Sequence, residues 1–188
     1  DYLIANSEYT QERIKKYYRR GSTVIYPPSP SSSSYPLPLG EGVRGEGKYF
    51  LVVSRLSPYK KIDLVVEAFN KLELPLIIIG EGEQCGYLQK IAKNNIKILG
   101  WQGDEKIAEY YANARALIFP TDDDFGIVPV EAMSHGVPVI AYRKGGAEET
   151  VQEGITGEFF DAQTPEVLAD GVRRFMEKES SYDKDVII

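Results

Sequence analysis

The stretch ARALIFPTDDDFGIVPVEAMSHGVPVIAY, Ala114–Tyr142, carries the pattern that decides the fold. It opens with an apolar strand, passes through three aspartates and closes with a second apolar strand, VPVIAY. Between the strands a helix is predicted over Ile127–His135, because Pro129 suits a first helical turn and Gly136 suits the position just past a helix end. A strand, a helix and a strand in this order predict a parallel pair with a crossover helix.

The rest of the chain repeats this alternation of apolar strands and helices. Strands are predicted in KYFLVVS, LPLIIIG, IKILG and TGEFF. Helices are predicted over Lys61–Leu72, Gln84–Lys93 and Asp104–Ala112, in GGAEETV, and after the cap residue Thr164. Asp104 is expected to cap its helix, and Met176 to face inward from the last one. Strands that are apolar throughout are typical of parallel sheets covered on both faces, so we predict an α/β fold with a doubly wound, mostly parallel, Rossmann-like sheet.

Four segments are expected along the chain. Residues 1–28 are interpreted as an interdomain link, made of a strand end, a helix over Glu8–Tyr18 capped by Ser7, and a short strand stopped by prolines. Residues 29–47 are predicted to be a low-complexity loop, because they are rich in Ser, Pro and Gly. Residues 48–178 are expected to form the Rossmann-like domain, and residues 179–188 a tail.

The composition argues against several functional classes. The chain has 188 residues with 28 acids and 22 bases, a net charge of -6, so no nucleic-acid partner is expected. The single cysteine, Cys85, excludes an internal disulfide and fits a reducing compartment, which favours a cytoplasmic location. No apolar run is long enough for a membrane-spanning helix. Because the chain starts at Asp1 and not at methionine, we expect it to be a piece of a longer protein.

In a doubly wound sheet the ligand lies past the carboxyl ends of the strands, so the loops found there carry the functional argument. The loop SRLSPYKK places Arg55, Lys60 and Lys61 between a strand and a helix. A helix N-terminus carries partial positive charge, so cations there need an anion to explain them. A phosphate or diphosphate satisfies this requirement. A solvated basic loop is the alternative.

The loop after the strand ARALIFP combines acids with a helix N-terminus. The free N–H groups and the dipole of the helix at Ile127 favour an anion. Asp123 and Glu131, eight positions apart, can address one ligand from different sides. Carboxylates accept hydrogen bonds from pairs of sugar hydroxyls, so the acids suit the sugar parts of a ligand whose phosphates meet the amides. The glycine pair in YRKGGAEET suggests a second nest of amides.

Two further strand-end loops contain glycines. GEGEQCG, which begins at Gly80, is one residue longer than the dinucleotide-binding fingerprint and carries acids that repel a pyrophosphate, so we interpret it as a tight turn. LGWQG places the apolar Leu99 and Trp101 around Gly100, where a flat base can pack. The alternative for Trp101 is an ordinary packed aromatic side chain.

Taken together, SRLSPYKK, GEG, LGW, FGIVPVEAMSHGVPVIAY and GGAEETV resemble, in order and spacing, one known family. They are similar to the carboxyl-terminal, donor-binding domain of retaining GT-B glycosyltransferases of family 4. The opening DYLIANSEYTQERIKKYY and TVIYPP resemble the link from the amino-terminal domain. The phrases DFGIVPVEAM and GVPVIAYRKGG look closest to mannosyltransferases that use GDP-mannose. The resemblance covers nearly the whole chain except residues 29–47 and the last ten or so.

The resemblance implies transfer of a hexosyl group, and of mannose in its closest form, from GDP-mannose or a UDP-sugar to a glycan or lipid-linked acceptor, with retention and without a metal or other cofactor. The implied catalytic residues are Arg55 and Lys60 at the donor diphosphate and Asp123 at the donor sugar. Asp123 departs from the family, which has glutamate there, and its side chain is one methylene shorter. The implied donor-binding residues are Glu131 at the ribose, the amides of Phe125, Gly126 and Ile127, Leu99, Gly100 and Trp101 at the base, and Gly80.

The resemblance also implies partners and leaves alternatives. An amino-terminal acceptor domain is expected before Asp1, so the chain alone is expected to bind nucleotide-sugar weakly and not to transfer it. Peripheral association of the parent enzyme with the inner face of the membrane stays open. A nucleotide-binding module without catalysis, and another GT-B enzyme such as a nucleotide-sugar epimerase or a phosphorylase, are the other hypotheses. A two-carboxylate glycosidase is rejected, because it needs no diphosphate site.

Overall fold

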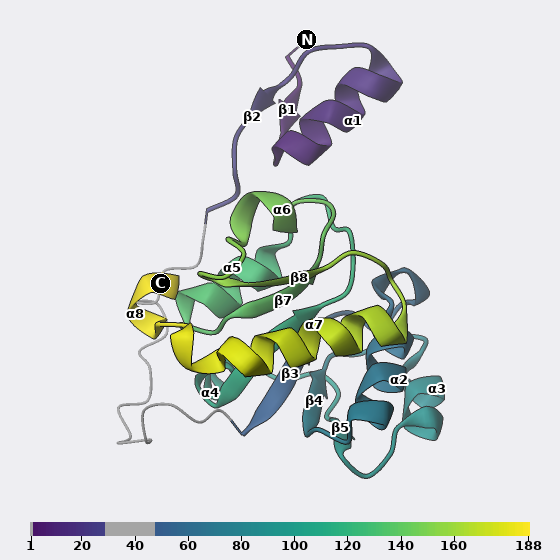
Figure 1. Ribbon diagram of the computed structural model, residues 1–188. Helices are drawn as coiled ribbons and strands as arrows, with labels where there is room; N and C mark the ends of the chain where they lie inside the picture. The colour runs from purple at the N-terminus through teal and green to yellow at the C-terminus, as the bar shows by residue number, and fades with distance from the viewer. Residues whose placement is uncertain (1, 29–47) are drawn as a thin grey trace.

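Six parallel strands form the central sheet of the computed structural model, which describes residues 2–28 and 48–188 (Figure 1). Every neighbouring pair in this sheet is parallel, so the predicted doubly wound α/β fold is confirmed. In spatial order the strands are β5 (Ile96–Ile98), β4 (Leu76–Ile79), β3 (Tyr49–Val53), β6 (Ala114–Phe119), β7 (Val139–Tyr142) and β8 (Gly157–Phe160).

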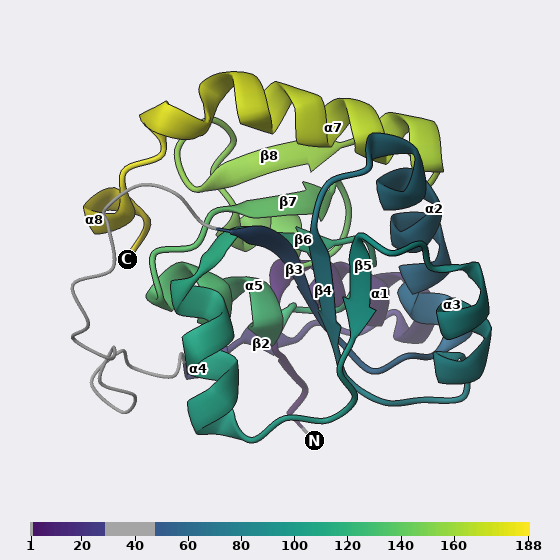
Figure 2. The same ribbon diagram turned by 90° about the horizontal axis from the view of Figure 1, so that it is seen from below.

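Helices cover both faces of the sheet, as the continuous apolar strands require. One face carries α2 (Ile62–Leu72), α3 (Cys85–Ile91) and α7 (Pro165–Lys178), and the other carries α4 (Asp104–Ala112) and α5 (Ile127–Ser134) (Figure 2). Phe50 of β3 packs edge-on against Phe69 of α2 and Phe175 of α7, with ring centroids 5.3 and 6.1 Å apart. Each such buried ring contributes about 1.5–3 kcal/mol, so this face of the sheet is held mainly by apolar contact.

The helices follow the sequence signals with two exceptions, one at a helix end and one on a helix face. Thr164 caps α7 as predicted, because its side chain accepts a hydrogen bond from the N–H of Val167. Asp104 does not cap α4: Gly103 occupies the cap position and Asp104 is the first helical residue. Met176, expected to face inward, is 38% exposed. It follows the buried Phe175 directly, and the helical rotation of about 100° per residue turns it to the edge of the apolar face.

The two ends of the described chain pack differently. Residues 2–28 form a small parallel unit of β1 (Ile4–Ala5), α1 (Glu8–Tyr18) and β2 (Thr23–Val24), which lies next to α6 (Ala147–Thr150) in Figure 1. The last ten residues, expected as a tail, contain the short helices η3 (Glu179–Ser181) and α8 (Lys184–Ile187). Tyr182 and Ile187 are buried there, so this segment belongs to the packed domain. The predicted low-complexity loop 29–47 lies outside the described residues.

The strand order reverses between β3 and β6, and the crevice of an open α/β sheet is expected at such a switch point. The chain runs from β3 outward through β4 to β5, and then returns to start β6 on the other side of β3. The loops after β3 and β6 therefore leave in opposite directions at the carboxyl edge, where open α/β sheets bind ligands. None of the helices in residues 2–28 and 48–188 is long and apolar enough to cross a membrane.

Candidate functional site

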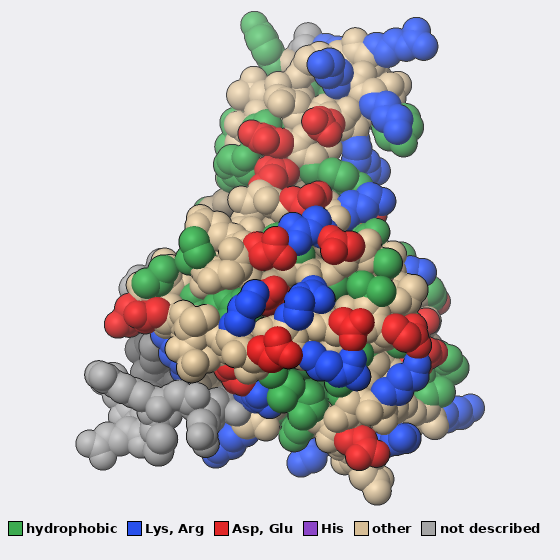
Figure 3. Space-filling model, viewed as in Figure 1, with side chains coloured by type: hydrophobic (Ala, Val, Ile, Leu, Met, Phe, Trp, Pro, Cys, Tyr) green, Lys and Arg blue, Asp and Glu red, His purple; other side chains and the backbone are tan. Residues whose placement is uncertain are grey.

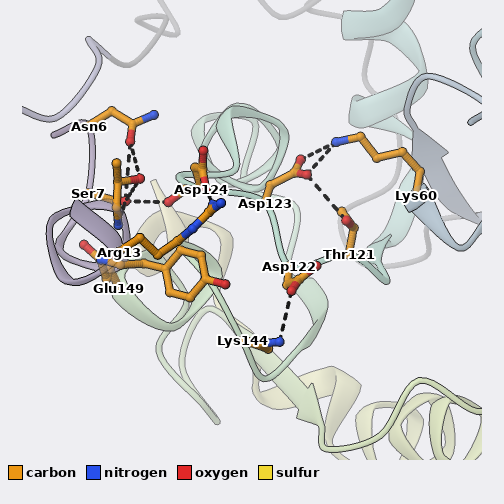
Figure 4. A network of polar contacts seen from close by, with 12 residues as sticks. Asn6, Ser7, Arg13, Lys60, Thr121, Asp122, Asp123, Asp124, Lys144 and Glu149 are labelled. Carbon is orange, nitrogen blue, oxygen red and sulfur yellow. Dashed lines mark hydrogen bonds and ion pairs between the residues drawn. The ribbon is translucent and has the colours of Figure 1, made fainter. Parts of the chain in front are cut away.

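Two predicted catalytic side chains meet at the crevice between β3 and β6. Lys60 ends the short helix η2 (Pro58–Lys60) that follows β3, and its Nζ lies 2.6 and 2.5 Å from the two carboxylate oxygens of Asp123, which follows β6 (Figure 4). The side chains of Lys60 and Asp123 are 15% and 29% exposed, so the pair is partly shielded from water. Arg55, in the same loop as Lys60, is exposed and forms no ion pair within the described part of the chain.

Each of the three consecutive aspartates pairs with a base from a different segment (Figure 4). These pairs fix the loop through its side chains to three other segments. Each aspartate therefore has a positive partner within the protein. No group of three His, Cys, Asp or Glu side chains that could hold a metal ion occurs in residues 2–28 and 48–188. The three pairs are Asp122 with Lys144, Asp123 with Lys60, and Asp124 with Arg13.

The amides at the start of α5 form a nest of unpaired N–H groups. The N–H groups of Phe125, Gly126 and Ile127 donate to no residue in the described ranges. Gly126 adopts a φ of 77°, a left-handed conformation that glycine accepts without strain and that turns the chain into the helix. Free amides at a helix N-terminus carry partial positive charge and favour an anion. This nest and the ammonium of Lys60 therefore both present positive charge to the same crevice.

Glu131 lies one helical turn beyond the nest and contacts α4. The hydroxyl of Tyr111 donates to its Oε2 at 3.1 Å. Burial raises the pKa of Glu131, the charge of Asp104 raises it further, and the hydrogen bond from Tyr111 acts against both. The sequence pointed to Glu131 but not to Tyr111, because a tyrosine at an apolar helical position looks like an ordinary core residue.

The expected base-binding residues lie at the carboxyl edge of β4 and β5. The N–H of Gly80 donates to the carbonyl of Gly100 at 2.9 Å, so this amide is used inside the protein. A Cβ at Gly80 would come within 1.8 Å of the carbonyl oxygen of Ser54, so the GEG glycines serve close packing between loops. Trp101 is 71% exposed, which rules out the alternative of a packed aromatic and leaves its ring accessible to a ligand.

The glycine pair after β7 packs directly against the aspartate loop. The N–H of Gly146 donates to the carbonyl of Asp123 at 2.9 Å, so this amide of the expected second nest is occupied by the protein. Gly145 has a φ of 78°, and its missing side chain would lie 2.5 Å from the same carbonyl. The pair therefore fixes the backbone of the loop that carries Asp123.

Replacing Gly146 by alanine is expected to destabilise the fold and displace this loop. The new Cβ would lie 2.2 Å from the carbonyl oxygen of Phe125, closer than real Cβ atoms come to another heavy atom. Overpacking of this kind costs about 1–3 kcal/mol, which a urea titration followed by circular dichroism measures as a lower midpoint. Gly86→Ala is the control, because nothing lies within 4 Å of its added Cβ. Equal midpoints for Gly146→Ala and the unsubstituted chain would contradict the close contact.

The small amino-terminal unit, residues 2–28, contacts the site through hydrogen bonds to Glu149 and to the aspartate loop. The carboxylate of Glu149 accepts hydrogen bonds from the N–H groups of Glu8 and Tyr9, both at 2.9 Å, and from the hydroxyl of Tyr26 at 3.1 Å. Ser7 Oγ donates to the carbonyl of Asp124 at 2.5 Å (Figure 4). The sequence signalled only an acid after the glycine pair, and its contact with α1 depends on the packing of two segments far apart in the chain.

The surface around α7 carries charges of both signs. Figure 3 shows lysine and arginine side chains interspersed with aspartate and glutamate over this helix. Lys71 pairs with Glu166, and Arg173 with Asp170. Nucleic-acid binding depends on a continuous basic surface. Because acids alternate with bases here, the described residues of this face do not form such a surface.

One family of known proteins matches most of the chain. The family described as Glycosyl transferases group 1 matches residues 40–186. Among curated proteins, an uncharacterized glycosyltransferase of Methanocaldococcus jannaschii is 26% identical over 184 residues, which cover 95% of this chain and 50% of that protein. A GDP-mannose-dependent alpha-(1-6)-phosphatidylinositol monomannoside mannosyltransferase of Mycobacterium tuberculosis is 28% identical, with coverage of 94% and 52%.

Solved structures match over the full length of the chain. A crystal structure of the Anabaena protein HepE in complex with UDP-glucose is similar with a TM-score of 0.80 and 26% identity, over 99% of this chain and 56% of that one. The chain spans about half the length of these relatives.

Proposed function

The chain belongs to the group 1 glycosyl transferases, and we propose that it binds the nucleotide-sugar donor of a hexosyltransferase that transfers mannose from GDP-mannose to a glycan or lipid-linked acceptor. The observation that carries this proposal is the meeting of Lys60, Asp123 and the α5 amides at one crevice. Positive groups there suit the donor diphosphate, and a carboxylate beside them suits a sugar. The acceptor is proposed to bind a domain outside this chain.

Each side of the donor has a proposed counterpart in the crevice. The diphosphate binds the amides of Phe125–Ile127, the ammonium of Lys60 and the guanidinium of Arg55, all of which can donate to phosphate oxygens. The ribose binds Glu131, because a carboxylate accepts hydrogen bonds from two neighbouring hydroxyls. The base packs on Leu99, Gly100 and the exposed ring of Trp101.

The chemistry proposed for this site is electrostatic. The bond between the anomeric carbon of the sugar and the diphosphate oxygen breaks, and a bond to an acceptor hydroxyl oxygen forms on the same face, while the hydroxyl proton passes to an oxygen of the leaving diphosphate. Negative charge grows on the leaving diphosphate, and preorganised donors such as the α5 amides stabilise it most in the transition state. Asp123 accepts hydrogen bonds from sugar hydroxyls once the diphosphate has taken its place beside Lys60.

The choice of GDP-mannose has two supports. The phrase DFGIVPVEAM and its continuation resemble mannosyltransferases, and the 28% identical relative from Mycobacterium tuberculosis is GDP-mannose-dependent by name. The similar HepE protein was crystallised with UDP-glucose, so uridine nucleotides are the natural comparison.

Calorimetric titration of the chain with GDP, GDP-mannose, UDP and UDP-glucose tests the proposal. We expect the guanosine nucleotides to bind most tightly, and the affinity to be unchanged by EDTA because the proposed site needs no metal. Tighter binding of UDP-glucose would replace mannose by another hexose and keep the donor site. Binding of none of the four nucleotides would overturn the donor-binding function itself.

A further inference from the structure

Tyr111 is held between two side chains of the neighbouring helix. It lies in the last turn of α4 and is only 1% exposed. Its ring stacks on the imidazole of His135, with centroids 5.2 Å apart and planes tilted by 16°. Its hydroxyl donates to Glu131 Oε2 at 3.1 Å. Glu131 lies on α5, and His135, four residues later, is the C-cap residue of that helix, so the tyrosine spans about one helical turn between them.

This arrangement divides the two oxygens of the Glu131 carboxylate. The Oε2 atom accepts the tyrosine hydroxyl, whereas Oε1 is bonded to no residue in the ranges 2–28 and 48–188. Glutamate has a flexible side chain, and restricting it to one rotamer when a ligand binds costs conformational free energy. A bond from a buried hydroxyl, itself fixed by ring stacking, restricts the side chain in advance.

We propose that Tyr111 is a positioning residue for donor binding: its hydroxyl fixes one oxygen of Glu131 and leaves the other to meet the ribose hydroxyls. The inference rests on the proposed function, because it needs Glu131 to contact the ribose. It adds a residue that acts through Glu131 and does not itself touch the donor.

The tyrosine hydrogen bond also favours the charged form of the carboxylate. Among the described residues, the titratable groups that act on Glu131 are Tyr111 and Asp104 from α4, and His135, the C-cap residue of α5, stacks on the Tyr111 ring. Burial and the charge of Asp104 raise the pKa of Glu131, and the Tyr111 hydrogen bond lowers it. Burial lowers the pKa of His135, so the imidazole is neutral near pH 7 and supplies no opposing charge. Loss of the hydroxyl therefore raises the pKa of Glu131 further.

The test is Tyr111→Phe in the chain, with nucleoside diphosphate affinity measured from pH 5 to pH 8. The phenylalanine keeps the ring that stacks on His135. We expect about tenfold weaker GDP or UDP binding near neutral pH, the usual effect of one lost hydrogen bond to a charged group. We also expect the loss of affinity on acidification to begin at a higher pH, because Glu131 is then protonated sooner. Inorganic pyrophosphate, which has no ribose, should bind equally to both forms.

Two controls separate positioning from a general structural effect. Tyr110→Phe removes a neighbouring hydroxyl that is bonded to no described residue, and it should leave affinity and pH dependence unchanged. In a chain that already carries Glu131→Ala, Tyr111→Phe should have no further effect on nucleotide affinity. Should Tyr111→Phe fail to fold, 3-fluorotyrosine at position 111 gives the opposite probe. Its more acidic hydroxyl donates a stronger hydrogen bond, so affinity should persist to a lower pH.

The outcomes are distinguishable. Tyr111→Phe with unchanged affinity and pH dependence, an equal loss of pyrophosphate binding, or an additive effect on top of Glu131→Ala would each overturn the positioning role. The donor site would stand in all three cases. Failure of the unsubstituted chain to bind any nucleotide would overturn the proposed function and this inference with it.

Discussion

Replacing Lys60 by alanine is expected to weaken the binding of GDP or UDP about 10- to 100-fold. The ammonium borders the crevice between β3 and β6 together with the open amides of α5, and no other described lysine contacts the Asp123 carboxylate. One charge-assisted hydrogen bond to a phosphate contributes about 1.5–3 kcal/mol, and each 1.4 kcal/mol is about tenfold in affinity. Calorimetry at low and moderate salt measures the loss, which should be larger at low salt because charges are less screened there.

Asp123→Ala is expected to strengthen the binding of GDP or UDP, the opposite of the effect of Lys60→Ala. The carboxylate occupies the ammonium of Lys60 in the ligand-free protein, so its removal frees the lysine for the diphosphate. Because the pair is partly exposed, the gain should be only several-fold, consistent with about 0.2–1 kcal/mol for such pairs. Lys90→Ala, at an exposed lysine on α3, is the charge-matched control for Lys60→Ala and should change the affinity little. Weaker GDP binding by Asp123→Ala would show that the carboxylate supports the diphosphate site and does not compete for it.

Replacing Glu131 by alanine is expected to remove recognition of the ribose. The unsubstituted chain should bind GDP about 10- to 100-fold more tightly than an analogue without ribose hydroxyls, because a charged acceptor facing two hydroxyls contributes about 1.5–3 kcal/mol. In Glu131→Ala the two nucleotides should bind equally, both at the level of the analogue. Competition against a fluorescent nucleotide measures all four affinities in one format.

The control for this experiment lies in the diphosphate. Inorganic pyrophosphate should bind Glu131→Ala and the unsubstituted chain alike, since the amides of Phe125–Ile127 and the ammonium of Lys60 are untouched. A Glu131→Ala chain that still discriminates GDP from its analogue would assign ribose recognition to another residue. A parallel loss of pyrophosphate binding would point to a damaged loop.

Much of the candidate site was accessible from local sequence. The basic loop with Lys60, the glycine and amide nest at Phe125–Ile127, and Glu131 on the following helix each carry a signal within a few residues. What local sequence did not indicate is which of these groups touch. Lys60 and Asp123 are 63 positions apart, and nothing in either loop specifies the other as its partner.

The sequence did not indicate the residues that contact the candidate site through another residue. Tyr111 lies 20 positions from Glu131 on a different helix, and its buried ring is indistinguishable in the sequence from a core aromatic. Glu149 accepts hydrogen bonds from two N–H groups of α1 that lie 140 and 141 positions away in the sequence. These contacts depend on how the small amino-terminal unit packs. The exposure of Trp101 was likewise undetermined, because the same residue type serves packing and ligand stacking.

The sequence by itself determined the alternation of strands and helices, the parallel sheet and the loops that gather at its carboxyl edge. Those features follow from apolar periodicity and from turn residues, which act over distances of a few residues. Only the tertiary structure decided the pairings inside TDDDFG: Lys144, Lys60 and Arg13 each neutralise one aspartate. The physical reason is that strand order and packing, and not spacing along the chain, bring these segments together: β6 lies between β3, which Lys60 follows, and β7, which Lys144 follows, and Arg13 comes from α1 of the small amino-terminal unit.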